Sequence, residues 1–171
     1  DLFGDILPVR ITNTTMQWHC TPTAKMVMLM GMQNMFYAMM DHPDEMHKLG
    51  KFLIDDVLAY IRWQEREGLL VLKNDNDYVG SGSYGFTDEF PTAASRRTGR
   101  VTLKDLWVNM NSQETVGVSP EMFADFFYPI YEEAAREYGA VYYGCCEPVH
   151  EVWDACLKNL PNLRKVSISA W

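Results

Sequence analysis

The chain has no surplus of positive charge and no hydrophobic run long enough to cross a membrane. Its 171 residues include 15 Lys and Arg against 23 Asp and Glu, which gives a net charge of −8. Phosphate binding needs clustered basic side chains, so this balance argues against a nucleic-acid-binding surface. No apolar run approaches the roughly 20 residues of a membrane span, and no signal peptide is visible. We therefore expect neither a nucleic-acid partner nor a membrane partner.

Cysteine is also scarce, and the cysteines present do not form a pattern typical of secreted proteins. The four lie at positions 20, 145, 146 and 156. Cys145 and Cys146 are adjacent and are poor candidates for a bridge to each other, and no other spacing resembles a disulfide framework. This usage predicts a reduced, cytoplasmic protein.

The two ends of the sequence favour interpreting it as a piece of a longer protein. It begins with Asp1-Leu2 instead of Met, and it stops at Ala170-Trp171, just where a predicted strand should lead into a loop. A chain of this length is still long enough to bury a sizeable core.

Apolar runs and helix-breaking residues alternate along the chain and predict alternating strands and helices. Such alternation, with Gly at helix ends, is typical of an α/β fold with parallel strands. The expected strands are 5–11, 69–72, 140–143 and 163–169, and the expected helices are 23–40, 43–67, 120–138 and 149–160.

Two helix starts carry clear local signals. Asp41 is a candidate N-cap with Pro43 at the first helical position, and Ser119 is an N-cap followed by Pro120. Residues 18–22 and 74–100 are expected to be loops, and the type of the element at 103–109 stays open. Loops as long as 74–100 are commonly lids or binding loops.

The strongest candidate site follows the predicted strand 140–143. Parallel α/β folds usually keep their chemistry at the carboxyl ends of strands, where Cys145, Cys146 and Glu147 stand here. Cys145 and His150 are candidate metal ligands, and Glu147 is a candidate general acid or base. The alternatives are a small buried thiol, an exposed helical His, and a carboxylate stabilised by a helix N-terminus.

Residues after the two earlier predicted strands complete this candidate site. Trp18 and His19 are substrate-binding candidates, although an ordinary loop is the alternative for both. Asp75 and Asp77 are catalytic candidates and Asn74 a substrate contact, but side chains of this kind also cap turns.

A further pair, Gln113 and Glu114, precedes the Ser-Pro helix and supplies candidate polar contacts to a ligand. The glycines at 80–85 do not predict a P-loop, because no Lys-Ser/Thr follows them.

Three segments, in this order, resemble the uroporphyrinogen decarboxylase (URO-D) superfamily. This family includes porphyrinogen decarboxylases and cobalamin-dependent methyltransferases. Residues 118–129 (VSPEMFADFFYP) resemble its Ser-Pro-x-x-Phe-x-x-Phe-x-x-Pro helix, and residues 142–146 (YYGCC) fall at its His-x-Cys-Gly strand end. Residues 44–49 (DEMHKL) resemble its Pro-Glu-x-x-His-x-Leu helix start.

The resemblance implies a (β/α)8 TIM-type barrel of which residues 1–171 form about half, as the C-terminal portion of a URO-D-like domain. Strands near 6–11, 69–74, 140–145 and 164–169 would be the fourth to seventh of that barrel. The segment 76–110 would be an insertion or lid.

The resemblance also implies a leading activity. The family's methyltransferases transfer methyl groups from a corrinoid carried on a partner protein and bind zinc through a His and a Cys two apart, with a further Cys from the last strand. Cys145 matches the first Cys, whereas Tyr143 stands in the His position and is taken as a substrate-binding residue.

Two alternatives stay open. The first is a metal-free decarboxylase or lyase of a carboxylated ring, with Asp75 or Asp77 set against a substrate nitrogen. The second is an isolated chain that is inactive and forms a homodimer through open barrel edges, because four strands cannot close such a barrel.

Overall fold

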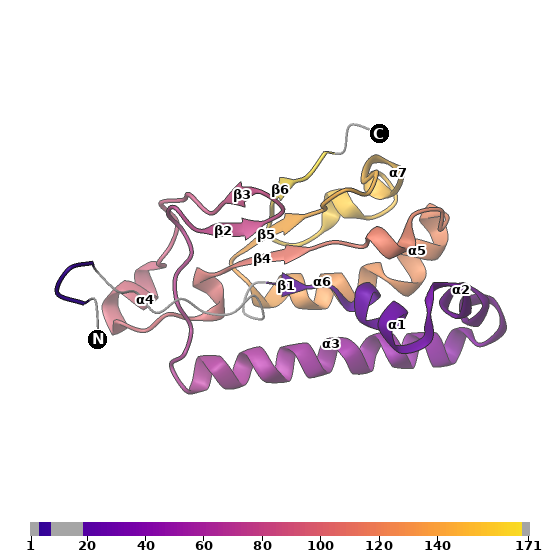
Figure 1. Ribbon diagram of the computed structural model, residues 1–171, viewed down its shortest axis with the longest axis horizontal. Coiled ribbons are helices and arrows are strands. Elements are labelled where there is room, and N and C mark those ends of the chain that lie inside the picture. Colours follow the sequence, from indigo (N-terminus) through magenta and orange to yellow (C-terminus); the bar gives the residue numbers. More distant parts are fainter. Residues whose placement is uncertain (1–3, 8–18, 169–171) are drawn as a thin grey trace.

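A computed structural model, which describes residues 4–7 and 19–168, has a mixed α/β fold built on a four-stranded parallel sheet (Figure 1). The strands follow the order β1-β4-β5-β6. They are β1 (His19–Cys20), β4 (Trp107–Met110), β5 (Ala140–Tyr143) and β6 (Leu163–Val166).

Helices cover one face of this sheet, with the long α3 (Pro43–Arg66) running beneath it (Figure 1). The other helices are α1 (Pro22–Met30), α2 (Met32–Asp41), α4 (Ala93–Thr98), α5 (Pro120–Phe126), α6 (Tyr128–Glu137) and α7 (His150–Trp153). Within the described residues, short 3-10 turns lie at Leu103–Asp105, Gln113–Thr115 and Leu157–Asn159.

The main core lies between these helices and the sheet. In α3 the apolar residues recur at helical spacing, so that one stripe is buried. The exposed positions are mostly polar but include Phe52, Tyr60 and Trp63. The buried stripe packs with apolar residues of α6 and with alternate residues of the strands, Val108, Met110 and Val141 among them.

A small antiparallel hairpin lies over the opposite face of the sheet (Figure 1). It consists of β2 (Tyr78–Gly80) and β3 (Ser83–Tyr84). A second buried cluster joins it to the sheet and contains Val79, Phe90, Trp107, Ala140 and Tyr142. Both faces of the central strands are therefore buried.

Several predicted elements are confirmed. Helix α3 runs almost over the predicted range, β5 occupies 140–143, and β6 lies within the predicted strand 163–169. Ser119 caps α5, where its side chain accepts a hydrogen bond from the N–H of Met122.

The strand predicted at 69–72 is wrong. These residues are irregular, and the position beside β5 is taken by β4, which lies inside the segment expected to be an insertion. Leu70 is buried and Leu72 packs against the second cluster, whereas Leu69 is exposed, so the run is covered only in part and does not pair in a ladder. Of the strand predicted at 5–11, residues 5–7 form a turn and bend, and the others lie outside the described residues.

Three predicted helices are shorter or divided. The helix expected at 23–40 begins at Pro22, with Thr21 before it, and is interrupted at Gly31, where φ is 80°. The helix expected at 120–138 divides at Phe127, two residues before Pro129, which has no N–H to continue the ladder. The helix expected at 149–160 is the short α7 followed by a 3-10 turn, and His42, not Asp41, is the N-cap of α3.

Within residues 4–7 and 19–168, no helix combines the length and the apolar character that crossing a membrane requires.

Candidate functional site

A row of four polar side chains crosses the face of the sheet that the hairpin covers. His19 of β1 pairs with Asn109 of β4, Asn109 with Tyr142 of β5, and Tyr142 with Lys165 of β6. Residues paired across neighbouring strands point to the same side of a sheet. Asn109 and Tyr142 are 1% and 4% exposed. We call these four residues the polar row.

The next residue along each strand points to the helices. This second set contains Cys20, Met110 and Tyr143, which belong to the main core, and Val166, which packs against it. Tyr143 is therefore on the opposite face from the polar row, although it stands two residues before Cys145.

The hairpin rests directly on the polar row. A Cβ at Gly80 would lie 2.1 Å from a ring carbon of Tyr142 and 2.7 Å from Nδ2 of Asn109, so only glycine allows this approach. The Tyr142 hydroxyl donates to the carbonyl of Ser81 at 3.3 Å. Lys165 donates to Oγ of Ser83 and to the carbonyl of Tyr84.

The indole ring of Trp107 packs against the Lys165 ammonium. Its indole N–H donates to the carbonyl of Gly85 at 3.0 Å, and the Lys165 ammonium lies 5.0 Å from the ring centroid. A cation over an indole face is stabilised by the ring's quadrupole. The lysine is thus held between the sheet and the hairpin.

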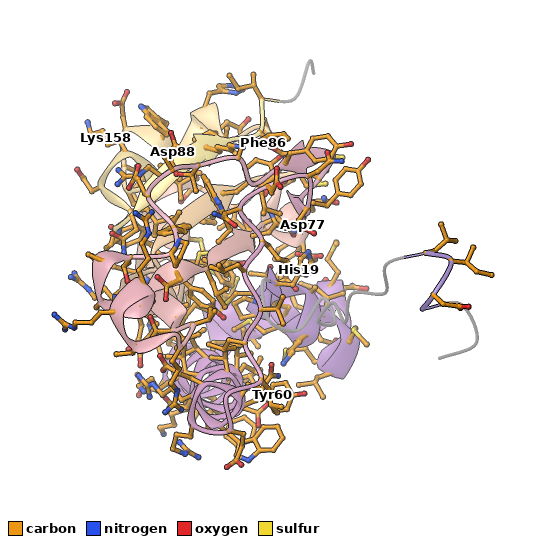
Figure 2. All side chains as sticks on the ribbon, turned by 90° about the vertical axis from the view of Figure 1, so that its left-hand side faces the viewer. His19, Tyr60, Asp77, Phe86, Asp88 and Lys158 are labelled. Carbon is orange, nitrogen blue, oxygen red and sulfur yellow. The ribbon has the colours of Figure 1, made fainter. Side chains whose placement is uncertain are left out.

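His19 lies in the middle of the molecule in Figure 2, above the end of α3 marked by Tyr60. Burial lowers the pKa of its imidazole, and a hydrogen bond with the Asn109 side chain opposes this effect only in part. Since the ordinary pKa of His is already below 7, His19 is neutral at pH 7. Asn109 in turn donates through Nδ2 to the carbonyl of Tyr142 at 3.3 Å.

Cys145 follows β5 and faces the tip of the hairpin. Gly144 turns the chain out of the strand with φ 97°, where any other residue would be strained. The Cys145 sulfur lies 2.9 Å from Oγ of Ser81 and 3.6 Å from the sulfur of Cys146. Ser81 therefore links Cys145 with Tyr142 of the polar row.

Glu147 joins the loops that follow β4 and β5. One carboxylate oxygen accepts from the N–H of Ser112 and the other from the N–H of Cys145, both at 2.9 Å. The residue is only 6% exposed. In this arrangement both oxygens are occupied by backbone donors, and the carboxylate positions Cys145.

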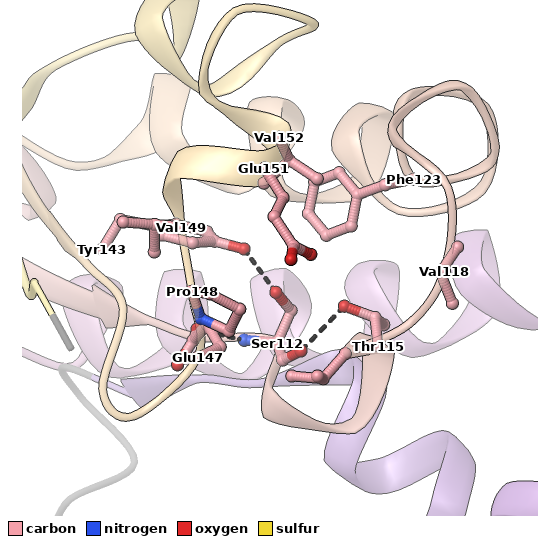
Figure 3. Close-up of a pocket in the computed structure, with 11 residues that line it drawn as sticks. Ser112, Thr115, Val118, Phe123, Tyr143, Glu147, Pro148, Val149, Glu151 and Val152 are labelled. Atoms are coloured by element: carbon pink, nitrogen blue, oxygen red, sulfur yellow. Dashed lines mark hydrogen bonds between the residues drawn. The ribbon is translucent and has the colours of Figure 1, made fainter. Parts of the chain in front are cut away.

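A small cavity lies behind these loops on the helix side (Figure 3). Its volume of about 20 Å³ accommodates a water molecule but not a substrate. The hydroxyls of Ser112 and Tyr143 share a hydrogen bond of 2.6 Å at its edge. Burial raises the pKa of Tyr143 well above the ordinary phenol value, so this hydroxyl stays protonated.

Glu114 belongs to a second buried network on the same side. It accepts a hydrogen bond of 2.8 Å from the hydroxyl of Thr23, which is also 3.0 Å from the hydroxyl of Tyr131. Tyr131 donates to the carbonyl of Asn111 at 2.6 Å. Neighbouring Gln113 is exposed.

The polar residues at 74–77 hold the loop that carries the hairpin. Asn74 donates through Nδ2 to the carbonyl of Phe90 at 2.7 Å, and the carbonyl of Asp77 accepts from the N–H of Gly85 at 3.0 Å. Asp75 is exposed and lines an open groove together with Asp88 and Arg96.

Two sequence-predicted site residues remain, His150 and Trp18. His150 is exposed on α7, and Trp18 lies outside the described residues.

The zinc site implied by the resemblance is not complete in the described residues. No group of three His, Cys, Asp or Glu side chains among them is arranged to hold a metal ion. Cys145 has Cys146 beside it, while Tyr143 faces the helices and Glu147 is engaged with backbone N–H groups. The described donors therefore supply only part of a tetrahedral zinc site.

Sequence reasoning missed Asn109, Tyr142 and Lys165. The only sequence signal for them is that every second residue of a strand faces the same side of the sheet. Because all residues of β4 and β5 are buried, these strands show no alternation of buried and exposed residues that would reveal the two sides. Comparisons of the chain with family models, with curated proteins and with solved structures found no match.

Proposed function

We propose that the chain is part of a URO-D-like enzyme, about half of a (β/α)8 barrel, and that it binds a small molecule over the polar row. The observation that carries the proposal is the polar row itself, which places His19, Asn109, Tyr142 and Lys165 side by side.

The arrangement of layers supports the half-barrel. The strands are parallel, and the long helix α3 and the shorter α6 lie on one face of the sheet. In a (β/α)8 barrel the helices form the outer ring, whereas a doubly wound sheet carries helices on both faces. The face with the polar row then corresponds to the barrel interior. Barrel interiors are usually filled by Val, Ile and Leu, so polar side chains there favour a binding site.

Three residues of the polar row have distinct uses toward a ligand. Neutral His19 can accept a proton, and the amide of Asn109 can orient a polar group. The Lys165 ammonium suits an anionic group of the ligand once the hairpin carbonyl of Tyr84 releases it. The hairpin is then the lid, and by covering the row it excludes water from the site.

Methyl transfer is the leading reaction class, with Cys145 as the thiol at the carboxyl end of β5. Zinc and a corrinoid on a partner protein belong to this proposal through the resemblance alone. A thiol in this role favours a reducing compartment such as the cytoplasm, in agreement with four free cysteines.

The decarboxylase alternative is favoured by the groove beside the hairpin. Arg96 lies there with Asp75 and Asp88. A guanidinium is suited to bind a substrate carboxylate, and a neighbouring aspartate is suited to face a ring nitrogen.

Metal content and ligand binding of the purified chain test these proposals together. Stoichiometric zinc that is lost in Cys145→Ser supports methyl transfer. Binding of a carboxylated tetrapyrrole that is lost in Arg96→Gln supports the decarboxylase alternative. A chain that binds neither zinc, a carboxylated tetrapyrrole nor a small thiol substrate, and that only self-associates, contradicts both activities.

A further inference from the structure

We propose that Cys145 and Cys146 form a dithiol site that chelates a thiophilic trivalent arsenic centre through both sulfurs. The proposal does not depend on the proposed function, because it concerns only the two thiols of this chain.

The geometry of the pair carries the inference. The two sulfurs are 3.6 Å apart, which is a contact and not a bond, and both point to the same side of the chain after β5. Cys146 is exposed and Cys145 half-buried, so a small ligand reaches both from solvent.

The backbone of Cys145 is held on both sides, so the pair is preorganised. The N–H of Cys145 donates to Glu147 at 2.9 Å, and its carbonyl accepts from the hydroxyl of Ser167 at 2.8 Å. Because the fold already holds the two sulfurs close together, a ligand that binds both loses little conformational entropy of the protein, and this favours chelation.

The composition of the site selects the ligand class. Soft thiolate donors prefer soft centres, and a tetrahedral metal would need two more donors. Among the described side chains no third His, Cys, Asp or Glu completes such a set. Trivalent arsenic that carries one organic group needs two further bonds, and the two cysteine sulfurs can supply both.

The binding step is a condensation without oxidation or reduction. An arsenoso compound R–As=O reacts with the two thiols, so that two As–S bonds form and the As=O bond breaks. The oxygen leaves as water with the two thiol protons, and arsenic stays trivalent.

The other two cysteines provide an internal contrast. Cys20 is fully buried and Cys156 is 3% exposed. Burial raises the pKa of Cys20 to about 12 and that of Cys156 to about 11. Among the described residues, the thiol–thiol contact is between Cys145 and Cys146, so neither Cys20 nor Cys156 offers a dithiol chelate.

The test uses phenylarsine oxide as the probe and intact-mass spectrometry of the native, reduced chain in EDTA as the measurement. We expect one phenylarsenic adduct that survives excess 2-mercaptoethanol and is removed by 2,3-dimercaptopropanol. Because the second sulfur acts intramolecularly, Cys146→Ser should weaken retention by about 10²-fold or more. Cys156→Ser is the matched control and should retain the adduct.

Two results would overturn the proposal. One is a wild-type chain with native circular dichroism that forms no monothiol-resistant adduct. The other is a Cys146→Ser chain that holds the adduct as firmly as the wild type. Zinc content plays no part in this readout, so failure here is distinguishable from failure of the methyl-transfer proposal.

Discussion

The two faces of the central sheet are built from the same strands but differ in the contacts that their side chains make. On the helix-covered face, Val108, Met110 and Val141 pack into the main core. On the hairpin-covered face, Tyr142 and Lys165 donate hydrogen bonds to the hairpin, and Asn109 donates to the carbonyl of Tyr142 within the sheet. Alternate residues of one strand therefore serve stability and a candidate site.

The difference shows how a short strand can be buried on both sides and still be polar on one. Buried polar groups are tolerated when they are hydrogen-bonded. The hairpin supplies partners for Tyr142 and Lys165, whereas His19 and Asn109 bond within the sheet. The helices supply only apolar contacts to most of the opposite face. Four predictions follow, from the largest expected effect to the smallest.

Truncation on the helix-covered face should have the largest effect on stability. Met110 is fully buried, and Met110→Ala should lower the free energy of unfolding by about 2–5 kcal/mol, because it leaves a cavity. Lys165→Met is the matched change on the hairpin-covered face and should alter it by about 1 kcal/mol or less. Urea denaturation measures both, and equal losses would remove the contrast between the faces.

Asp105 lies at the amino end of β4 and should support both faces alike. Burial acts to raise its pKa, but hydrogen bonds from Ser95, Thr92 and Thr102 outweigh burial and lower the pKa below its usual value. Asp105→Asn should therefore lower the free energy of unfolding by about 1.5–3 kcal/mol at pH 7.

The pH dependence of this effect has a defined sign. A depressed folded-state pKa adds stability above the unfolded value of about 4, and this contribution is lost as the pH falls through the folded value. The difference between Asp105→Asn and the wild type should shrink from about pH 4 downward. Urea unfolding across this range measures it, and a difference that is constant with pH would contradict the assignment.

Displacing the hairpin should affect mainly the hairpin-covered face. Gly80→Ala places a Cβ against the Tyr142 ring and should lower the free energy of unfolding by about 1–3 kcal/mol. Hydrogen exchange at 78–84 should accelerate, while exchange in α3 should follow only the global loss. Gly82→Ala is the control, since its Cβ meets nothing within 4 Å and introduces only backbone strain at φ 72°. Equal acceleration in both variants would mean that contact with the sheet does not hold the hairpin.

Two buried tyrosines on the helix side give the smallest effects, with opposite signs. The hydroxyl of Tyr138 has no hydrogen-bond partner in the described part of the chain, so Tyr138→Phe should leave stability unchanged or raise it by about 1 kcal/mol. Tyr131→Phe removes the bond to the Asn111 carbonyl and should lower stability by about 1 kcal/mol. Thermal unfolding of the two variants checks the order, and a reversed order would contradict the hydrogen-bond assignment.

Local signals in the sequence predicted the parts of the fold that depend on neighbouring residues. The stripe of α3, the Ser119–Pro120 helix start and the apolar run of β5 are of this kind. Strand β4 was not predicted, because Trp107–Met110 has no periodicity of its own and becomes a strand by pairing with β5. The two-residue β1 depends in the same way on β4.

The residues of the candidate site likewise fall into those that local sequence signals predicted and those that depend on contacts between distant segments. The carboxyl-end argument picked out Cys145 from its place in the sequence. It also picked out His19, but as part of a loop after a strand at 5–11, whereas His19 lies within β1. Asn109, Tyr142 and Lys165 needed the register between strands, which joins residues far apart in the chain. Ser81 needed the hairpin to fold back over the sheet, which no local pattern predicts.

Two neighbouring residues of β4 test the central claim most directly, since Val108 faces the helices and Asn109 faces the hairpin. The measurement is the ligand-induced rise in Tm for small thiols and carboxylated tetrapyrroles. We predict that Val108→Ala lowers Tm but keeps the rise, whereas Asn109→Leu abolishes the rise. A rise that is lost in Val108→Ala and kept in Asn109→Leu, or no rise in the wild type with any of these ligands, would contradict the account.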